Sequence, residues 1–377
     1  MHMSHIFEFT LGIYGDGQLA RLLVESCEKQ NITPLVYTLN ERESPCRGLC
    51  VLQQGKNWTD KKSFTEFAQR CEFIVLENEF VPAEFLLEAE QYGATILPNA
   101  QSFAKISNKL KQVELAESLN IKVPDYLVIT SPDHLLQVKL PAMLKSLSGG
   151  YDGYGNFTFK TLDQLKDAKK FIEARGPALA QEFIFFDQEV AVLVAGDGKE
   201  YFSFPVVETI QEKNICHFVL TPPRFSEAIQ KKVKAAALKL IKSIQGKGLF
   251  GVEFFIRGSQ VIFNEIAPRP HNSGHYSIEA CDYSQFDALV KLMKGTPLTQ
   301  PVLTRPVAGM LNLLGTHNGK AAFKGDDSFH TNREGFLHLY GKEDSRIGRK
   351  MGHYTLLGQD QETVLQTLTH LKARYEI

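Results

Sequence analysis

Polar side chains suited to cation and anion chemistry gather at the end of one apolar run, residues 262–276 (IFNEIAPRPHNSGHY). Asn264 and Glu265 lie within its strand-like part, and Arg269 and His271 follow the first proline. Carboxylate and amide oxygens suit a hard cation, whereas arginine and histidine can hold an anion. The order of these residues predicts a site where a cation and a small anionic substrate lie close together.

The preceding segment brings a second carboxylate to this site. If residues 258–260 (Gly-Ser-Gln) form a three-residue turn, strand pairing places Glu253 directly opposite Glu265. Like charges that face each other across strands are destabilising, so an apolar-flanked pair needs a cation between its members or one protonated member. With the Asn264 amide, the pair favours Mg²⁺, and Mn²⁺ is a second candidate. The alternative is an exposed acidic face of an edge hairpin.

His271 and His275 are four residues apart, a spacing that on a helix would suit zinc. Pro268, Pro270 and Gly274 argue against a regular helix here, and no third soft ligand lies nearby in the sequence. A polar loop that contacts a small anionic substrate is therefore the favoured interpretation.

A glycine-rich segment, residues 145–155 (KSLSGGYDGYG), is a second candidate site. Glycines cost backbone entropy, so this density suits a loop whose N–H groups cover phosphates, with Lys145 as a cation at its base. A simple flexible hairpin is the alternative. The spacing is not that of a P-loop.

A strand-to-helix turn at residues 12–20 (GIYGDGQLA) could place backbone N–H groups against an anion. Dinucleotide binding would need an acid at the end of the second strand, but none occurs before Glu41. A plain tight turn or a site for another phosphate therefore remain alternatives. Near the C-terminus, residues 346–353 (RIGRKMGH) form either a solvated charged turn or a phosphate clamp.

The elements that must position these residues differ along the chain. Residues 6–98 alternate short β-rich runs with helix-like segments, which predicts βαβ units and a parallel sheet. Residues 99–119 predict a linking helix. Antiparallel strands, a helix near residues 226–245 and the hairpin described above follow, before a β-rich tail. We therefore expect an α/β and α+β protein.

The 377-residue composition, 43% hydrophobic and 23% charged, is typical of a globular protein of two or three domains. A net charge of −1 excludes a global attraction to nucleic acid or an anionic membrane. The six cysteines show no disulfide framework, and neither a signal peptide nor a membrane-spanning run is apparent. We expect a cytoplasmic protein with no nucleic-acid or membrane partner.

Together the motifs resemble the 5-(carboxyamino)imidazole ribonucleotide synthases, which are ATP-grasp ligases of de novo purine synthesis. The resemblance covers about residues 10–360; NEIAPRPHNSGHY is its most specific motif, and GGYDGxG and GRKMGH support it. It implies an ATP-grasp fold with an N-terminal Rossmann-like domain (1–98), an ATP-grasp domain (99–300, with a lid at about 123–186) and a small β-rich C-terminal domain (301–377). It also implies an ADP-forming homodimeric ligase that uses ATP, Mg²⁺ and bicarbonate to carboxylate 5-aminoimidazole ribonucleotide (AIR).

The resemblance further implies roles for individual positions. The metal ligands would be Glu253, Asn264 and Glu265. Nucleotide-binding positions fall on Lys109, Lys145, Gly150, Tyr151, Asp152, Gly153, Tyr154, Gly155, Asn156, Gln181, Glu182, Phe183, Ile184, Glu189, Gln211, Asn264 and Glu265. Positions for AIR and bicarbonate fall on Gln18, Glu77, Tyr151, Asp152, Arg269, His271, Asn272, Arg349 and Lys350. Catalytic roles would fall on Arg269, His271, Asn272 and Asp152, with Asp152 and His271 as candidate general bases.

The chain departs from the family pattern in two places. Leu147, Ser148 and Tyr154 stand where cations are usual, and residues 77–82 (ENEFVP) rearrange the usual Glu-Phe-Glu-Asn-Val-Pro. Alternative functions are another ATP-grasp carboxylate–amine ligase, such as a formate-using transformylase, or an ATP-binding protein without catalysis. An NAD-dependent oxidoreductase would need the missing ribose-binding acid. HNSGHY followed by GRKMGH favours the first assignment.

Overall fold

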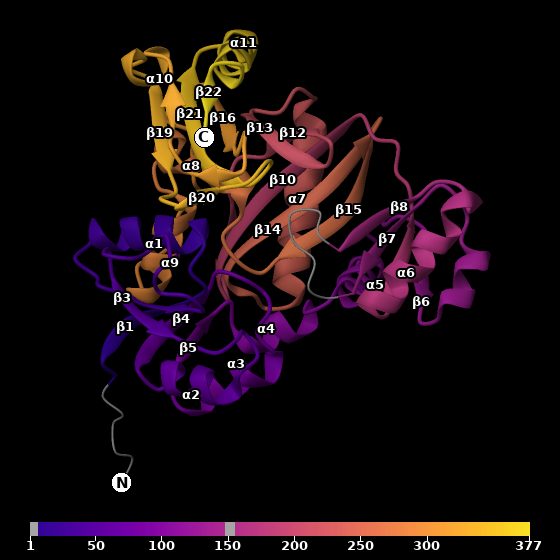
Figure 1. Cartoon of the computed structure of the whole chain (residues 1–377), viewed down its shortest axis with the longest axis horizontal. Helices are drawn as coiled ribbons and strands as arrows, with labels where there is room; N and C mark the ends of the chain where they lie inside the picture. Colours follow the sequence, from indigo (N-terminus) through magenta and orange to yellow (C-terminus); the bar gives the residue numbers. More distant parts are fainter. Residues whose placement is uncertain (1–6, 148–154) are drawn as a thin grey trace.

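The computed structural model describes residues 7–147 and 155–377. A parallel sheet near the N-terminus runs in the order β3-β2-β1-β4-β5 (Figure 1). It comprises β1 (Phe9–Tyr14), β2 (Leu35–Thr38), β3 (Val51–Gln54), β4 (Cys71–Leu76) and β5 (Thr95–Leu97), with α1 (Gln18–Glu28), α2 (Lys61–Ala68) and α3 (Ala83–Gln91) in the connections. This alternation confirms the predicted βαβ organisation.

The segment predicted as one linking helix forms two, α4 (Ala100–Lys105) and α5 (Lys109–Ser118). The side chain of Asn108 accepts a hydrogen bond from the backbone N–H of Lys111 at 2.9 Å and thereby caps α5. The single-helix prediction was wrong because this capping residue starts a new helix. As a result, Lys109 lies in the first turn of α5.

A small antiparallel sheet in the order β6-β9-β7-β8 follows, at the right of Figure 1. Its elements are β6 (Tyr126–Ile129), β7 (Ala142–Ser146), β8 (Asn156–Phe159) and β9 (Ala178–Glu182), with α6 (Leu165–Arg175) and the 3₁₀ turns Pro132–Gln137 and Leu162–Gln164. Residues 148–154 of the glycine-rich segment, between β7 and β8, lie outside the described residues.

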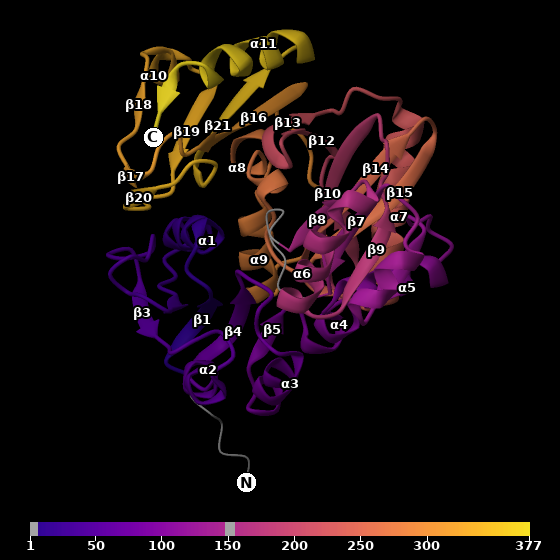
Figure 2. The ribbon, with the colours of Figure 1, turned by 45° about the vertical axis from the view of Figure 1, so that its right-hand side comes forward.

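The central antiparallel sheet runs β15-β14-β10-β12-β13-β16-β21-β19, and β11 pairs with β10. Its strands are β10 (Gln188–Asp197), β11 (Tyr201–Ser203), β12 (Val207–Glu212), β13 (Ile215–Thr221), β14 (Lys247–Arg257), β15 (Gln260–Ala267), β16 (Val307–Leu314), β19 (Gly335–Leu339) and β21 (Lys350–Gly358). The C-terminal strands extend this sheet from β13 to β16 and β21 (Figure 2). Phe218 of β13 pairs with Leu311 of β16.

The remaining elements connect and cover these sheets. They are α7 (Glu227–Ser243), the 3₁₀ turn Asn272–Gly274, α8 (Ser277–Ala280), α9 (Gln285–Met293), β17 (Gly319–Lys320), β18 (Lys324–Gly325), α10 (Ser328–Thr331), β20 (Asp344–Ser345), α11 (Gln361–Lys372) and β22 (Tyr375–Glu376). α7 confirms the helix predicted near residues 226–245. Among the described helices, none combines the length and apolar character needed to cross a bilayer.

The N-terminal and central sheets share a hydrophobic core around α9. Leu22 and Leu23 of α1 belong to the same buried cluster as Leu289 of α9 and Leu193 of β10. The Ser26 hydroxyl also donates a hydrogen bond to Asp287 of α9 at 2.7 Å. This shared core fixes the N-terminal sheet against the sheet that carries the carboxylate hairpin. All six cysteines are free thiols.

Candidate active site

The strands β14 and β15 place Glu253 directly opposite Glu265, as predicted, but by a different route. The turn is tighter than the expected three residues, because Arg257 pairs with Gln260. The pairing register then shifts by one residue, which leaves Asn264 as the extra residue of a β-bulge. The predicted facing pair is correct and the predicted turn is wrong.

The bulge changes which face of the sheet Asn264 presents. In a regular strand, Asn264 would point away from its neighbour Glu265, since alternate side chains face opposite sides. Instead, its amide nitrogen donates to Glu253 Oε2 at 3.0 Å, on the carboxylate side. Bulges re-aim side chains in this way. Two carboxylates and one amide therefore converge on one face of the hairpin.

Two lysines from other elements reach this group of oxygens. Lys109 of α5 forms an ion pair with Glu265, and the Lys145 ammonium group of β7 donates to Asn264 Oδ1 at 2.7 Å. Two positive charges thus lie against this group, as expected for partly buried carboxylates that face each other across strands. The predicted pair of nucleotide-binding lysines lies together at the predicted metal ligands.

Burial and charge drive the pKa values of this group apart. Burial, together with Glu265, raises the pKa of Glu253 to about 7. Burial alone would also raise the pKa of Glu265, but Lys109 and Lys145 lower it to about 2. Burial and the neighbouring Lys109 lower the pKa of Lys145 to about 8. Strongly perturbed titratable groups that lie together are typical of functional sites.

Glu189 and Gln211 lie side by side on β10 and β12, where the Gln211 amide donates to Glu189 Oε1 at 2.7 Å. Burial, with Glu253 and Glu265 nearby, raises the pKa of Glu189 well above its usual range. In the small sheet, Gln181 of β9 is buried, and its Oε1 has no hydrogen-bond partner among the described residues. Such a buried acceptor is suited to a ligand donor.

The segment after β15 adds two cationic or titratable groups. Arg269 forms an ion pair with Glu79, which lies in the loop after β4 (Cys71–Leu76). His271 Nε2 lies 3.4 Å from Glu253 Oε1, and its Nδ1 lies 2.8 Å from the Ser273 hydroxyl. His271 thus bridges the loop to the carboxylate pair.

Asn272 and His275 have different surroundings. Asn272 exchanges two 2.9 Å hydrogen bonds with Asn312 of β16, and both residues are buried. His275 is buried, bonded to Gln285 and stacked on the Phe286 ring. Because His275 lies in this packed environment while His271 faces Glu253, the two histidines do not form the zinc pair considered from their spacing.

Glu77 follows β4 and lies beneath the first glycine turn. A Cβ atom on Gly17 would come within 2.3 Å of Glu77 Oε1, and one on Gly15 within 2.7 Å of its Oε2. These glycines therefore leave room for a carboxylate at the start of α1. Burial raises the pKa of Glu77 to about 7, although Arg269 and Lys342 act in the opposite direction.

The C-terminal part of the chain contacts α1 beside Glu77. The Lys342 ammonium group donates to Gln18 Oε1 at 2.8 Å and to the Lys350 carbonyl at 2.6 Å. The Arg349 guanidinium donates to the Asp344 carbonyl at 2.6 Å. The Lys342 ammonium group therefore lies at the junction of α1, β4 and β21, close to Gln18, Glu77 and Lys350.

Three domain families match consecutive parts of the chain. Residues 9–107 match a ribonucleotide synthetase preATP-grasp domain, residues 114–286 an ATP-grasp domain, and residues 308–367 a phosphoribosylaminoimidazole carboxylase C-terminal domain. The N5-carboxyaminoimidazole ribonucleotide synthase of Synechococcus elongatus is 34% identical over 92% of this chain and 89% of its own length. The chain belongs to the N5-carboxyaminoimidazole ribonucleotide synthase family. The resemblance found in the sequence is confirmed.

Solved structures of family members agree with this assignment. The Staphylococcus aureus synthetase complexed with ADP has a TM-score of 0.85 at 31% identity, covering 97% of each chain. The Aspergillus clavatus synthase in complex with ADP and 5-aminoimidazole ribonucleotide has a TM-score of 0.84 at 31% identity, covering 97% of this chain and 99% of that one. The predicted fold class, with preATP-grasp, ATP-grasp and C-terminal domains, is confirmed.

Several positions expected from the family pattern lie outside the described residues. These are Ser148, Gly150, Tyr151, Asp152, Gly153 and Tyr154. Of the neighbouring positions, the Gly155 carbonyl accepts from the Ser146 N–H at 2.9 Å, and Asn156 begins β8 as an exposed residue. Leu147, at a position where the synthase family usually has a cation, packs against the core of the central sheet.

The predicted adenine-binding segment lies at the end of β9. The N–H groups of Glu182 and Phe183 donate to the carbonyls of Asp125 and Pro141, at 2.7 and 3.1 Å. Ile184 is buried. The N–H groups of Glu182 and Phe183 are therefore engaged within the protein, and the role of this segment in binding the base stays a prediction.

The structure also brings in residues that the sequence did not point to. Glu79 pairs with Arg269, Lys342 reaches Gln18, and Asn312 holds Asn272. Glu79 lies in the rearranged segment 77–82 but was given no role there, and Lys342 and Asn312 lie in none of the motifs above. Each meets its partner across at least 40 residues of chain, so only the fold could have revealed these contacts.

Proposed function

We propose that this chain is an N5-carboxyaminoimidazole ribonucleotide synthase. The reaction passes the γ-phosphoryl group of ATP to bicarbonate to give carboxyphosphate, and then transfers its carboxyl group, directly or as carbon dioxide, to the exocyclic amine of AIR. ADP and inorganic phosphate are released. Family membership supports this proposal, as do the relatives described in complex with ADP and with AIR.

One observation of the structure carries the proposal furthest. Glu253, Asn264 and Glu265 converge from a bulged hairpin, and two lysines from separate elements meet them. Phosphoryl transfer is catalysed mainly by positioning and charge neutralisation, so this group matches what the reaction needs.

The donor set fits magnesium. Its carboxylate and amide oxygens are hard ligands, and Lys109 and Lys145 already supply positive charge at the same oxygens. Glu253, Asn264 and Glu265 would hold the ion, which when bound neutralises phosphate charge. The two lysines lie close enough to this group to bind the nucleotide phosphates. Glu189 and Gln211 would receive the ribose hydroxyls, and Gln181 offers an unpartnered acceptor.

The loop after β15 supplies the acceptor side. Arg269 would stabilise charge on the transferred group, and His271, next to Glu253, would hold a bicarbonate oxygen. Asn272 is oriented by its two hydrogen bonds with Asn312. A carboxylated product forms only if water is kept out, which is the role we assign to the glycine-rich segment at 148–154.

We assign the junction of α1, β4 and β21 to AIR. Gln18 and Glu77 lie there with Lys350, Lys342 joins Gln18 to the Lys350 backbone, and Arg349 is adjacent in sequence. Arg269 influences Glu77 electrostatically and so connects this junction with the bicarbonate side. The missing cations at positions 147, 148 and 154 should lower the affinity for phosphate, by about 1 kcal/mol or more each.

The test is a phosphate-release assay in which each substrate is omitted in turn. We expect release that requires ATP, bicarbonate and AIR together, and a carboxylated ribonucleotide as product. Full activity when formate replaces bicarbonate would identify a formate-using ligase instead. If the chain binds ADP but releases no phosphate under any condition, it is a nucleotide-binding protein without catalysis. A homodimer, Mn²⁺ as a substitute for Mg²⁺ and a cytoplasmic location remain predictions.

A further inference from the structure

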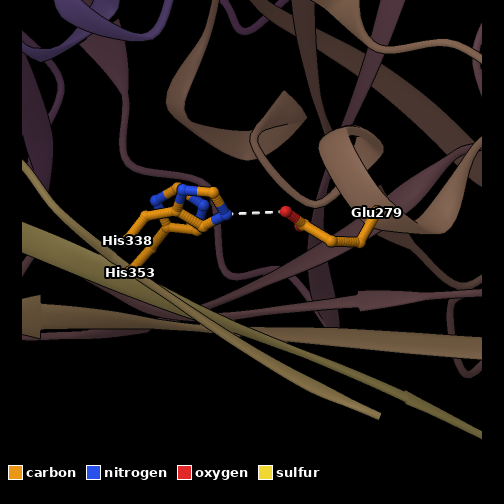
Figure 3. A group of neighbouring side chains, drawn as sticks. All are labelled: Glu279, His338 and His353. Atoms are coloured by element: carbon orange, nitrogen blue, oxygen red, sulfur yellow. Dashed lines mark hydrogen bonds and ion pairs between the residues drawn. The ribbon is translucent and has the colours of Figure 1, made fainter. Parts of the chain in front are cut away.

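A second group of ligating side chains lies in the C-terminal part of the chain, apart from the carboxylate hairpin. Glu279 of α8, His338 of β19 and His353 of β21 each offer an atom within 4.8 Å of the others (Figure 3). The two imidazole rings are stacked, with centroids 4.5 Å apart, because His338 and His353 are direct partners across the strands. The Glu279 carboxylate points at their edge.

An ion pair accounts for only part of this cluster. His338 Nε2 lies 2.6 Å from Glu279 Oε1. Glu279 Oε2 and His353 Nε2 are also buried, yet neither has a hydrogen-bond partner among the described residues. Buried polar atoms without partners cost stability, so two at the same place call for an explanation.

The surroundings of His353 suit a metal ligand. Its other nitrogen, Nδ1, lies 3.0 Å from the Tyr340 hydroxyl, which can hold the ring in the form whose Nε2 carries a lone pair. The ring is fully buried, and its centroid lies 5.1 Å from that of the His275 ring. Two imidazoles and a carboxylate are the donor set of many zinc sites, whereas Mg²⁺ disfavours imidazole.

We propose that Glu279, His338 and His353 form a binding site for a zinc-class divalent ion, distinct from the nucleotide's cation site. The nearly parallel rings, 12° apart, require one ring to turn before both can share an ion. His338 can do so because its side chain is 23% exposed, whereas His353 is enclosed. The ion would tie α8, directly after the acceptor loop, to the strand that begins with Lys350.

The experiment measures zinc binding to the full chain in a His2→Gln/His5→Gln background, which removes the histidines near the N-terminus. After metal removal by chelation, zinc is titrated with excess Mg²⁺-ADP present, and bound metal and thermal stability are measured. We expect about one tightly bound ion per chain and a higher Tm. Cobalt bound in place of zinc should give the visible absorption expected of an ion with a low coordination number.

Variants locate the ion. His338→Gln and Glu279→Gln should each abolish the zinc-dependent rise in Tm, while the exposed His330→Gln on α10 should leave it unchanged. Glu265→Gln should also keep it, which separates this site from the proposed active site. ADP binding verifies the fold of His338→Gln, Glu279→Gln and His330→Gln, and far-ultraviolet circular dichroism verifies that of Glu265→Gln. Zinc binding equal in wild type and His338→Gln, or absent from both, would overturn the proposal and leave a buried ion pair with an ordered water.

Discussion

Single residues in this site carry charges that burial disfavours. Glu253, Glu265 and Lys109 are partly buried and Lys145 is buried, and the two lysines offset the repulsion between the two carboxylates. Removing one member leaves its partners uncompensated, which is the costly case for buried charges.

Glu265→Gln should lower ATP turnover by at least about 100-fold with the fold intact, since it removes both a magnesium ligand and the partner of Lys109. Phosphate release and far-ultraviolet circular dichroism measure the two effects. Glu66→Gln, an exposed change on α2, is the control. Near-normal turnover in Glu265→Gln would refute the metal assignment.

Lys350→Ala should raise the KM for AIR far more than the KM for ATP, because Lys350 lies at the junction with Gln18 rather than at the hairpin. Steady-state kinetics with each substrate varied in turn measures both values. Equal increases in the two KM values would place Lys350 elsewhere.

Glu77 should make stability depend on pH. Its folded pKa is raised to about 7, so the folded state holds a proton that the unfolded chain has released between about pH 4.5 and 7. The Glu77 contribution to the unfolding free energy should therefore fall as pH rises through this window. Glu77→Gln should be stabilising relative to wild type at about pH 8 and much less so at about pH 5, as measured by urea unfolding. A pH-independent difference would contradict a Glu77 carboxyl that keeps its proton in the folded state up to about pH 7.

At the scale of elements, a helix cap and a β-bulge determine where two of the site's side chains lie. The Asn108 cap starts α5 at the residue that binds Glu265, and the bulge turns Asn264 toward Lys145. The cap thus sets the position of Lys109, and the bulge sets the direction of the Asn264 amide.

Asn108→Ala should cost about 1 kcal/mol of stability through the lost cap, and should also weaken ADP binding because Lys109 loses its fixed position. Asp60→Ala removes the equivalent cap of α2, where Asp60 accepts from the Ser63 N–H at 3.1 Å. It should lower stability similarly without affecting ADP. Calorimetric titration and thermal unfolding separate the two effects; unchanged affinity in Asn108→Ala would show that Lys109 does not depend on the cap.

Sequence patterns were sufficient where chemistry is local. The alternating runs of residues 6–98 predicted the parallel sheet, and the motif around Glu265 predicted the family. Both signals depend only on residues that are close together in the sequence. The bulge at Asn264 and the break at Asn108 were missed, since a one-residue register shift and a cap depend on packing. The pairings of Glu79 with Arg269 and of Lys342 with Gln18 could not be predicted, because the partners are distant in sequence.

At the scale of the whole molecule, the C-terminal strands belong to the central sheet. β16 covers the edge of β13, where Phe218 and Leu220 pair with Leu311 and Gly309. A chain that ends at residue 306 would expose this edge and the apolar cluster around it, which is a template for aggregation. The C-terminal domain is therefore part of the folding unit.

We expect a chain of residues 1–306 to aggregate when expressed alone and to be recovered in the monodisperse fraction when residues 307–377 are co-expressed. Size-exclusion chromatography measures this outcome. A well-folded, monodisperse 1–306 chain with normal thermal unfolding would show that the β13 edge does not need its neighbour.

The continuous ladder from β15 to β21 also limits how the enzyme can move. Glu253 and Glu265 lie on β14 and β15 at one edge of the central sheet, and Lys350 lies on β21 near the opposite edge. Because hydrogen-bonded strands join these positions without a break, the distance between them cannot change by rotation about a linker. Movement toward and away from the nucleotide is left to the β6-β9-β7-β8 sheet, which is separate from this ladder. We therefore expect the distance between phosphoryl donor and amine acceptor to stay constant through turnover, while access to both opens and closes from one side.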